Sequence, residues 1–355
     1  MNIHKYLKVV LLIIGINRIE IFAYPVVSNV PLFMSGGIIQ IGDAVACYCL
    51  AKILSLKYNI PFVYSHFQYH DFFAFSDREK SDLNEPIWST HKPWIFVNNK
   101  DDIFRNLNNK NVLFFAGIRT LIDYIAPEWI AELKRDLQLK TIPHVFDLPK
   151  DKITVGVHIR KGNGGGQIYD GEVASEQEFD YDRTKVKYII FENFPFDWPN
   201  YERKNGHFFK DHEYKNQLPP DKYEYVATKF PPNQFFIDTI KKLSQDLKDK
   251  PIFIQICTDD KNPEVLVQKI KNAVNKSNIT FYYDNDRHLP YRDRILRDLY
   301  MLARVDVLIR PQSYFSKISE MIGNHKLVIF PFHYQWDNNK LIMTQIAMRG
   351  SISKL

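Results

Sequence analysis

The sequence predicts an α/β protein made of two Rossmann-like domains. The chain of 355 residues is 45% hydrophobic and 25% charged, a composition that can supply cores for two domains of ordinary size. Short apolar runs typical of buried strands alternate with helical patterns, which favours parallel sheets. A polar, proline-marked stretch at residues 147–152 separates two such series. We therefore place a first domain at residues 24–150 and a second at residues 151–355.

The first residues have the pattern of an export signal. Lys5 and Lys8 precede an apolar run at residues 9–16, and Ala23 is a small residue at a possible cleavage point. The run is too short to span a bilayer, so no stable membrane span is expected. We expect residues 1–23 to be a signal peptide that sends the protein into a secretory or periplasmic space. The alternative is an opening strand of an uncleaved, cytoplasmic protein.

The first domain is expected to combine short strands with one long amphipathic helix. Apolar positions three apart predict the helix at residues 43–58, and strands are expected at 30–34, 60–64, 94–97 and 112–116. Another helical pattern continues to Ile130, and Pro127 is expected to break or restart it.

The second domain shows the more regular alternation. We expect its strands at residues 153–158, 252–257, 279–283, 305–309 and 327–330, with a helix between each pair. A long irregular region with a glycine-rich start at 162–166 follows the first strand and reaches Phe230, a length typical of functional or disordered loops. Ligands of doubly wound sheets bind beyond the carboxyl ends of the strands, so residues just after these strands are the candidates.

The first strand ends in a basic motif. His158 and Arg160 occupy alternate positions and should share one face, whereas Lys161 should point away. The planar fork of an arginine beside glycines suits a diphosphate, because it makes bidentate, charge-assisted hydrogen bonds. The alternative is an ordinary surface arginine with a hydrogen-bonded core histidine.

Polar residues also follow two further strands. Asp259 and Asp260 come after residues 252–257, where a carboxylate can accept hydrogen bonds from a base or a ribose. Ser313 and Ser316 come after residues 305–309, where each can cap the next helix or line a phosphate site at its positive end. Because all three motifs belong to one predicted sheet, their joint position is the main functional signal.

The order and spacing of four segments resemble motifs of the α1,2- and α1,6-fucosyltransferases. These segments are residues 158–161, 257–260, 296–303 and 313–316, and the resemblance covers mainly residues 153–332. It implies a GT-B fold, GDP-fucose as donor, inversion of configuration, and neither a metal nor another cofactor. It also implies a role for each strand-end motif: the diphosphate on Arg160, the base on His158 and on Asp259 or Asp260, and the phosphates along the turn from Ser313 to Ser316.

The chain departs from that family pattern at the basic motif. The family usually has two adjacent arginines and then an aspartate, whereas this chain has Arg160, Lys161 and Asn163. Lysine keeps the charge and loses the fork. Gln312 stands where asparagine is common. These departures motivate an alternative, an exported carbohydrate-binding protein without transfer activity.

Three carboxylates are candidates for the base that activates the acceptor, expected to be a glycan or glycoconjugate. Asp43 follows glycines at a predicted helix start, which resembles the first loop of GT-B enzymes such as heptosyltransferases, a second alternative. An N-cap role explains Asp43 equally well. Asp170 and Glu172 follow the glycine-rich loop and are rivals for the same role.

Composition and spacing argue against several other classes. The net charge of +6 comes without a Lys/Arg block of the kind that binds nucleic acid. The three cysteines form neither a disulfide framework nor a metal motif. A metal-dependent GT-A transferase is the nearest enzymatic rival, since Asp284 and Asp286 follow a predicted strand and could hold a divalent cation. An Asx-rich turn explains them as well.

Overall fold

The computed structural model describes a defined part of the chain. The described residues are 26–28, 41–58, 62–64, 69–78, 95–97, 114–116, 127–141, 146–161, 179–180, 184–191, 230–248, 250–260, 262–284, 288–337 and 340–355. The expected signal peptide, the expected strand at 30–34, the glycine-rich loop at 162–166, Asp170 and Glu172 all lie outside them.

The first half of the chain contains a small parallel sheet with the order β2-β1-β4-β3. Its strands are β1 (Val26–Ser28), β2 (Phe62–Tyr64), β3 (Ile95–Val97) and β4 (Phe114–Ala116). The helices of this half are α2 (Ile41–Tyr58), α5 (Pro127–Asp136) and the short 3-10 turns His70–Phe72 and Ala74–Asp77. Helix α5 begins at Pro127, because proline fits the first turn of a helix, where its missing N–H is not needed.

A buried hydrogen bond holds the helices of the first half together. The Tyr48 hydroxyl on α2 donates to Asp136 Oδ2 at the end of α5, at 2.8 Å. The Tyr48 ring also stacks on Phe75, with centroids 4.0 Å apart. Since a buried carboxylate needs partners, this contact fixes α2 and α5 relative to the segment that carries Phe75.

The second half builds an eight-stranded sheet around five parallel strands in the order β9-β8-β5-β10-β11. These strands are β5 (Ile153–Ile159), β8 (Ile252–Thr258), β9 (Ile279–Tyr283), β10 (Val307–Ile309) and β11 (Leu327–Asp337). The strand that comes first in the chain lies in the middle, the next two lie on one side of it, and the last two lie on the other. This is the strand order of a doubly wound Rossmann sheet.

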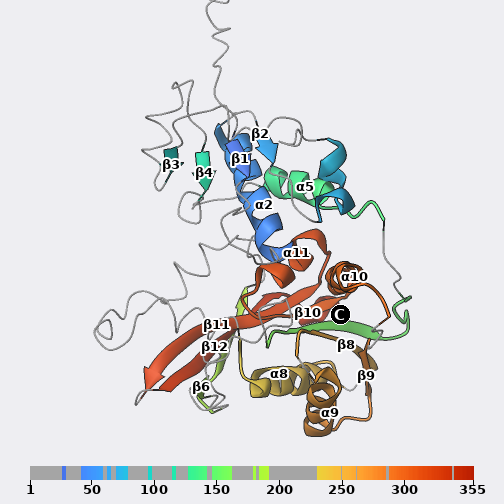
Figure 1. Ribbon diagram of the computed structural model, residues 1–355. Helices are drawn as coiled ribbons and strands as arrows, with labels where there is room; N and C mark the ends of the chain where they lie inside the picture. Colours follow the sequence, from blue (N-terminus) through green and yellow to red (C-terminus); the bar gives the residue numbers. More distant parts are fainter. Residues whose placement is uncertain are drawn as a thin grey trace, which may run out of the picture.

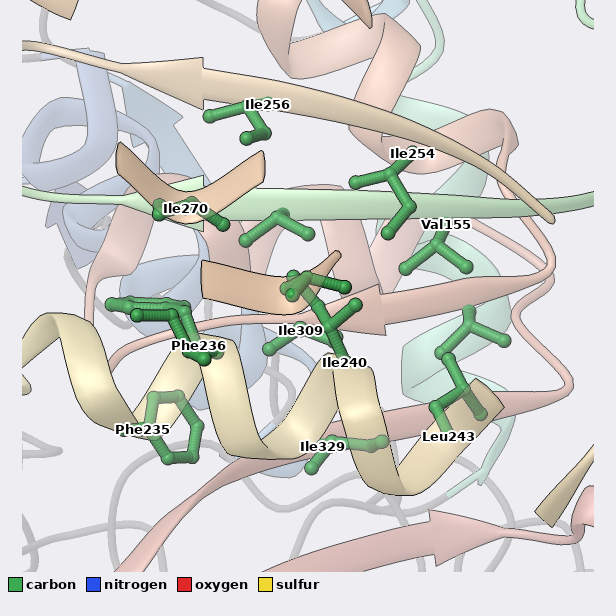
Figure 2. Close-up of a cluster of buried hydrophobic side chains, with 14 of the residues drawn as sticks. Val155, Phe235, Phe236, Ile240, Leu243, Ile254, Ile256, Ile270, Ile309 and Ile329 are labelled. Carbon is green, nitrogen blue, oxygen red and sulfur yellow. The ribbon is translucent and has the colours of Figure 1, made fainter. Parts of the chain in front are cut away.

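Helices cover both faces of this sheet, as Figure 1 shows. The helices are α8 (Asn233–Asp246), α9 (Pro263–Val274), α10 (Tyr291–Arg304) and α11 (Tyr314–Ile322). In Figure 2, Phe236, Ile240 and Leu243 of α8 point at Val155 and Ile309 of the strands, within one continuous apolar core. The prediction of two α/β units with parallel sheets is confirmed, and this tandem arrangement is the one that the GT-B class requires.

The strand β5 presents a different surface to each face of the sheet. Val155, Val157 and Ile159 belong to the core under α8 and α9. Gly156 lies on the opposite face, where a Cβ atom would come within 2.9 Å of Leu302 on α10. The glycine therefore lets α10 lie close to the strand, and the same face continues to His158.

The sheet ends in a long hairpin that the apolar pattern did not predict. Strand β11 runs on to Asp337, well past the expected end at residue 330, and pairs antiparallel with β12 (Lys340–Gly350). Strands β6 (Phe179–Asp180) and β7 (Lys187–Phe191) pair parallel to β12. Polar and aromatic residues mixed along both strands hide the alternation that would mark them.

The two halves meet along helix α11. Helix α2 packs against α11, and a Cβ atom at Gly42 would lie 2.9 Å from the Phe315 nitrogen. At the other end of α11, Lys134 Nζ on α5 donates to the Gly323 carbonyl at 3.0 Å. Within the described residues, no helix combines the length and the apolarity that are needed to span a bilayer.

Candidate functional site

The candidate site lies where the strand order of the large sheet reverses, between β5 and β10. The chain leaves β5 towards β8 and β9 on one side and later returns to β10 on the other side. Ligands of such folds bind beyond the carboxyl ends of the strands at this point. Arg160 follows β5, and Ser313 follows β10.

A buried hydrogen bond joins these two strand ends. Arg160 Nη1 donates to Ser313 Oγ at 3.1 Å, and the two residues are 7% and 1% exposed. The guanidinium also lies 5.8 Å from the centroid of the Phe230 ring. Because a hydroxyl contact and a ring face both fix its orientation, the guanidinium presents a preset fork of donors rather than a flexible point charge.

Ser313 begins helix α11 without capping it through its side chain. It occupies the N-cap position, but its hydroxyl accepts from Arg160 instead of from the first amide groups of the helix. The Ser316 hydroxyl donates to the Ser313 carbonyl at 3.2 Å and so closes the turn. The positive end of α11 thus lies directly beside the guanidinium, and both favour an anion.

His158 is buried on the same face of β5 and remains neutral. Its ring is 7% exposed and packs on Phe315, with centroids 5.3 Å apart. Burial, and then the charges of Arg160 and Arg310, lower the pKa of His158 to about 3. Among the described residues, its Nδ1 atom is buried without a hydrogen-bond partner. Such atoms are rare in folded proteins, and a ligand atom is one way to satisfy this one.

Asp259 and Asp260 lie at the end of β8, where backbone amide groups engage both carboxylates. Asp259 Oδ1 accepts from the Lys161 nitrogen at 2.6 Å, which ties the end of β8 to the end of β5. Asp260 Oδ1 accepts from the Asn262 nitrogen at 2.7 Å, an Asx turn that leads into α9. Both aspartates therefore shape the strand ends, whatever they add to ligand binding.

The acidic residues after β9 are engaged as well. Asp284 Oδ2 lies 2.5 Å from Arg297 Nη1, and Asp298 Oδ1 lies 3.9 Å from Arg297 Nε. Burial raises the pKa of Asp298, the Arg297 charge opposes the rise, and the Asp284 charge adds to it. Water that reaches the 29% exposed side chain limits that rise. Asp284 is thus paired with Arg297, and Asp286, the second carboxylate of the metal-dependent alternative, lies outside the described residues.

The first half reaches this edge of the sheet through the segment that begins at Tyr69. Arg292 on α10 lies over the Phe72 ring, 4.7 Å from its centroid. Burial, and then Tyr69 and Asp259, raise the pKa of Tyr291, whereas Arg294 and Arg160 oppose the rise. Tyr291 thus stands among groups from both halves of the chain. Sequence reasoning missed it because one aromatic residue at a helix start carries no distinctive pattern.

The candidate bases remain predictions. Helix α2 begins at Ile41, which places Asp43 in its first turn, and both the N-cap role and the base role of Asp43 stay predictions. Asp170 and Glu172 lie outside the described residues. In the part of the chain that the structure covers, no three His, Cys, Asp or Glu side chains form a metal-binding group.

Sequence reasoning also missed Arg310, the residue directly after β10. It is fully buried, and its Nε donates to Glu320 Oε2 at 2.6 Å. A charged residue at a strand end is the signal that drew attention to Arg160. After β10 the sequence pattern favoured the serines as the phosphate-binding residues, and Arg310 was passed over.

No protein-family model matches the chain, and no curated protein matches it. Among solved structures, it is similar to a NodZ α1,6-fucosyltransferase soaked with GDP-fucose, with a TM-score of 0.40, 11% identity, and coverage of 87% of this chain and 95% of that one. It is similar to the fucosyltransferase NodZ from Bradyrhizobium, with a TM-score of 0.40, 12% identity, and coverage of 82% and 92%. It is also similar to POFUT1 in complex with GDP-fucose, with a TM-score of 0.42, 11% identity, and coverage of 81% and 91%. Likeness at this level carries no conclusion about donor or acceptor.

Proposed function

We propose that this chain is a glycosyltransferase that transfers fucose from GDP-fucose to a glycan acceptor, with inversion and without a metal. The observation that carries the proposal is the buried hydrogen bond from Arg160 to Ser313 across the point where the strand order reverses. It places a fixed guanidinium beside the positive end of α11, an arrangement suited to a diphosphate.

In the proposed reaction the acceptor hydroxyl attacks the anomeric carbon of the donor sugar. A carbon–oxygen bond forms on one face of the sugar while the bond to the diphosphate oxygen breaks on the other, so configuration inverts. The leaving diphosphate gains negative charge, which Arg160 and the amide end of α11 stabilise in the place of a metal ion. A carboxylate accepts the proton of the hydroxyl, and Asp43, Asp170 and Glu172 are the candidates.

His158 contributes to donor binding as a neutral group. With a pKa of about 3, its ring is uncharged at neutral pH and cannot serve as the general base by taking up a proton there. Its buried Nδ1, which lacks a partner among the described residues, offers one hydrogen bond to the donor. The nucleoside is the part of the donor that we assign to it, together with Asp259 or Asp260.

Export of the protein also remains a proposal, resting on Lys5, Lys8 and the apolar run at residues 9–16 alone. N-terminal sequencing of the protein recovered from its native host should give a chain that starts near Tyr24. A chain recovered with residues 1–23 intact would instead favour a cytoplasmic location.

A thermal-shift screen of the purified protein tests the proposed donor. We expect GDP and GDP-fucose to raise the Tm without added metal, and EDTA to leave the shift unchanged. A ligand at a hundred times its Kd adds about 2.7 kcal/mol to the free energy of unfolding. Arg160→Ala should lose most of the shift, and Lys161→Ala should keep it.

The same screen separates the alternatives. A shift with UDP that requires manganese would replace the proposal with a GT-A transferase, and a shift only with another nucleotide sugar would favour a heptosyltransferase-like enzyme. Glycan binding without donor hydrolysis or transfer would identify a carbohydrate-binding protein.

A further inference from the structure

A buried group of three charged side chains lies behind the strand-end site. Arg310 follows β10, Glu320 belongs to α11, and Arg349 belongs to β12. Arg310 Nε donates to Glu320 Oε2 at 2.6 Å, and Arg349 Nη2 pairs with Glu320 Oε1. Both guanidinium groups lie over the Phe330 ring, 4.5 Å and 5.6 Å from its centroid. Within this group, two positive charges share a single carboxylate.

Stability alone is a poor explanation for such a group. Removing charges from water is costly, and well-packed apolar side chains of the same volume commonly do as well as a buried ion pair or better. Arg310 is fully buried and Glu320 is 6% exposed. The position of these three side chains behind the strand-end site therefore points to a role other than folding stability.

Arg310 makes a third contact, and this one leads to the site. Its Nη1 donates to the Pro311 carbonyl at 3.1 Å, in the turn that carries Ser313. The Ser313 carbonyl in turn accepts from the Lys317 nitrogen at 3.0 Å, and the Ser313 hydroxyl accepts from Arg160. One guanidinium therefore links the end of β10 to both the turn before α11 and the body of α11.

We propose that Arg310 is a positioning residue for the strand-end anion site. It holds the 311–313 turn against α11, so that the Ser313 hydroxyl meets Arg160 and the first amide groups of α11 face the anion. The anion-site role rests on the proposed function, whereas the holding of the turn does not.

Two matched substitutions test this inference. Arg310→Met leaves Glu320 paired with Arg349, and Arg349→Met leaves Glu320 paired with Arg310, so each variant loses one buried charge and keeps one ion pair. Arg310→Lys keeps the charge and loses the fork. Hydrogen–deuterium exchange of residues 311–317, measured on the ligand-free protein, reports on the turn. Titration with GDP reports on the anion site.

We expect Arg310→Met to speed exchange at residues 311–317 at least fivefold and to weaken GDP binding at least fivefold, with changes below twofold in Arg349→Met. Arg310→Lys should show the fast exchange with a smaller loss of GDP affinity, and it serves as the test if the methionine variant does not fold. Parental exchange in Arg310→Lys, or equal effects of the two methionine variants, would overturn the inference. If the parent protein binds no GDP but the exchange results are as expected, the proposed function fails and the positioning of the turn stands.

Discussion

Two neighbouring regions at the carboxyl edge of one sheet carry opposite charge. The ends of β5 and β10 bring together Arg160, Ser313 and His158, whereas the ends of β8 and β9 bring together Asp259 and Asp284. Backbone amides or an arginine already engage the acidic side chains. In the basic region, His158 Nδ1 is buried without a partner among the described residues. We therefore expect the basic region to receive the ligand and the acidic region mainly to hold the backbone in place.

The largest expected effect tests the basic region. Arg160→Ala should lower the rate of sugar transfer about a hundredfold, or about 2.7 kcal/mol of barrier, because it removes the fixed charge beside the leaving diphosphate. Arg160→Lys keeps a charge and loses the bidentate fork, so we expect about a tenfold loss. Initial rates with GDP-fucose and a suitable acceptor measure both. A folded Arg160→Ala protein with the parental rate would remove the residue from the mechanism.

The second effect concerns the neutrality of His158. An unfolded histidine has a pKa of 6.5, and the folded value is about 3. Between these values the unfolded chain binds a proton that the folded chain does not, so this residue makes the protein less stable as the pH falls from 6.5 towards 3. The contribution is absent above pH 6.5.

His158→Gln should remove this dependence. Between pH 7 and pH 4.5, urea unfolding of the variant should show a loss of stability smaller by on the order of 2 kcal/mol than that of the parent. His325, whose pKa burial also lowers, is present in both proteins and cancels in the difference. Parallel pH profiles would mean that His158 is solvated, and the two regions would then differ less than we describe.

A smaller effect distinguishes Asp259 from its neighbour Asp260. Asp259→Ala should weaken GDP binding about tenfold, roughly 1.4 kcal/mol, because Asp259 holds the backbone of Lys161 next to Arg160. Asp260→Ala should weaken it about threefold or less, since its carboxylate serves the turn into α9. Calorimetric titration compares the two variants. If Asp260→Ala costs more than Asp259→Ala, Asp260 is the carboxylate that binds the nucleoside, and the order that we derive from the backbone contacts is wrong.

The smallest effect is expected at Lys161. Its backbone nitrogen is engaged by Asp259, and alternation along the strand places its side chain on the other face from Arg160. Lys161→Ala should therefore reduce the transfer rate less than about threefold, well under the 1.4 kcal/mol of a tenfold change. A loss as large as that of Arg160→Ala would show that both cations face the donor, and the alternation argument would be wrong.

The sequence predicts the second half of the chain far better than the hairpin that ends it. Strands such as β8 and β10 are mainly apolar runs because both of their faces are buried, and such runs are visible in any single sequence. Strand β12 mixes Thr344 and Gln345 with apolar residues, and its partners β6 and β7 are two and five residues long. Such strands form because they pair with segments far away in the sequence, and no local pattern predicts this pairing.

The sequence likewise predicts some features of the candidate site and not others. The shared face of Gly156 and His158 follows from strand alternation, and the strand-end rule marks Arg160 and Ser313 in advance. The contact between Arg160 and Ser313 could not be read from the sequence, because it depends on β10 lying beside β5. The buried group around Glu320 needs three elements to converge, and its members stand 10 and 29 positions away from Glu320 in the chain (320 − 310 and 349 − 320).

Helix α11 has a mechanical consequence beyond its role at the site. The first half of the chain contacts it at both ends, through Gly42 against Phe315 and through Lys134 on the Gly323 carbonyl. A hinge at one end of α11 would break one of these two contacts and keep the other. The halves would therefore have to give up the contacts at both ends of α11, and the contact of Arg292 with Phe72, before they could separate.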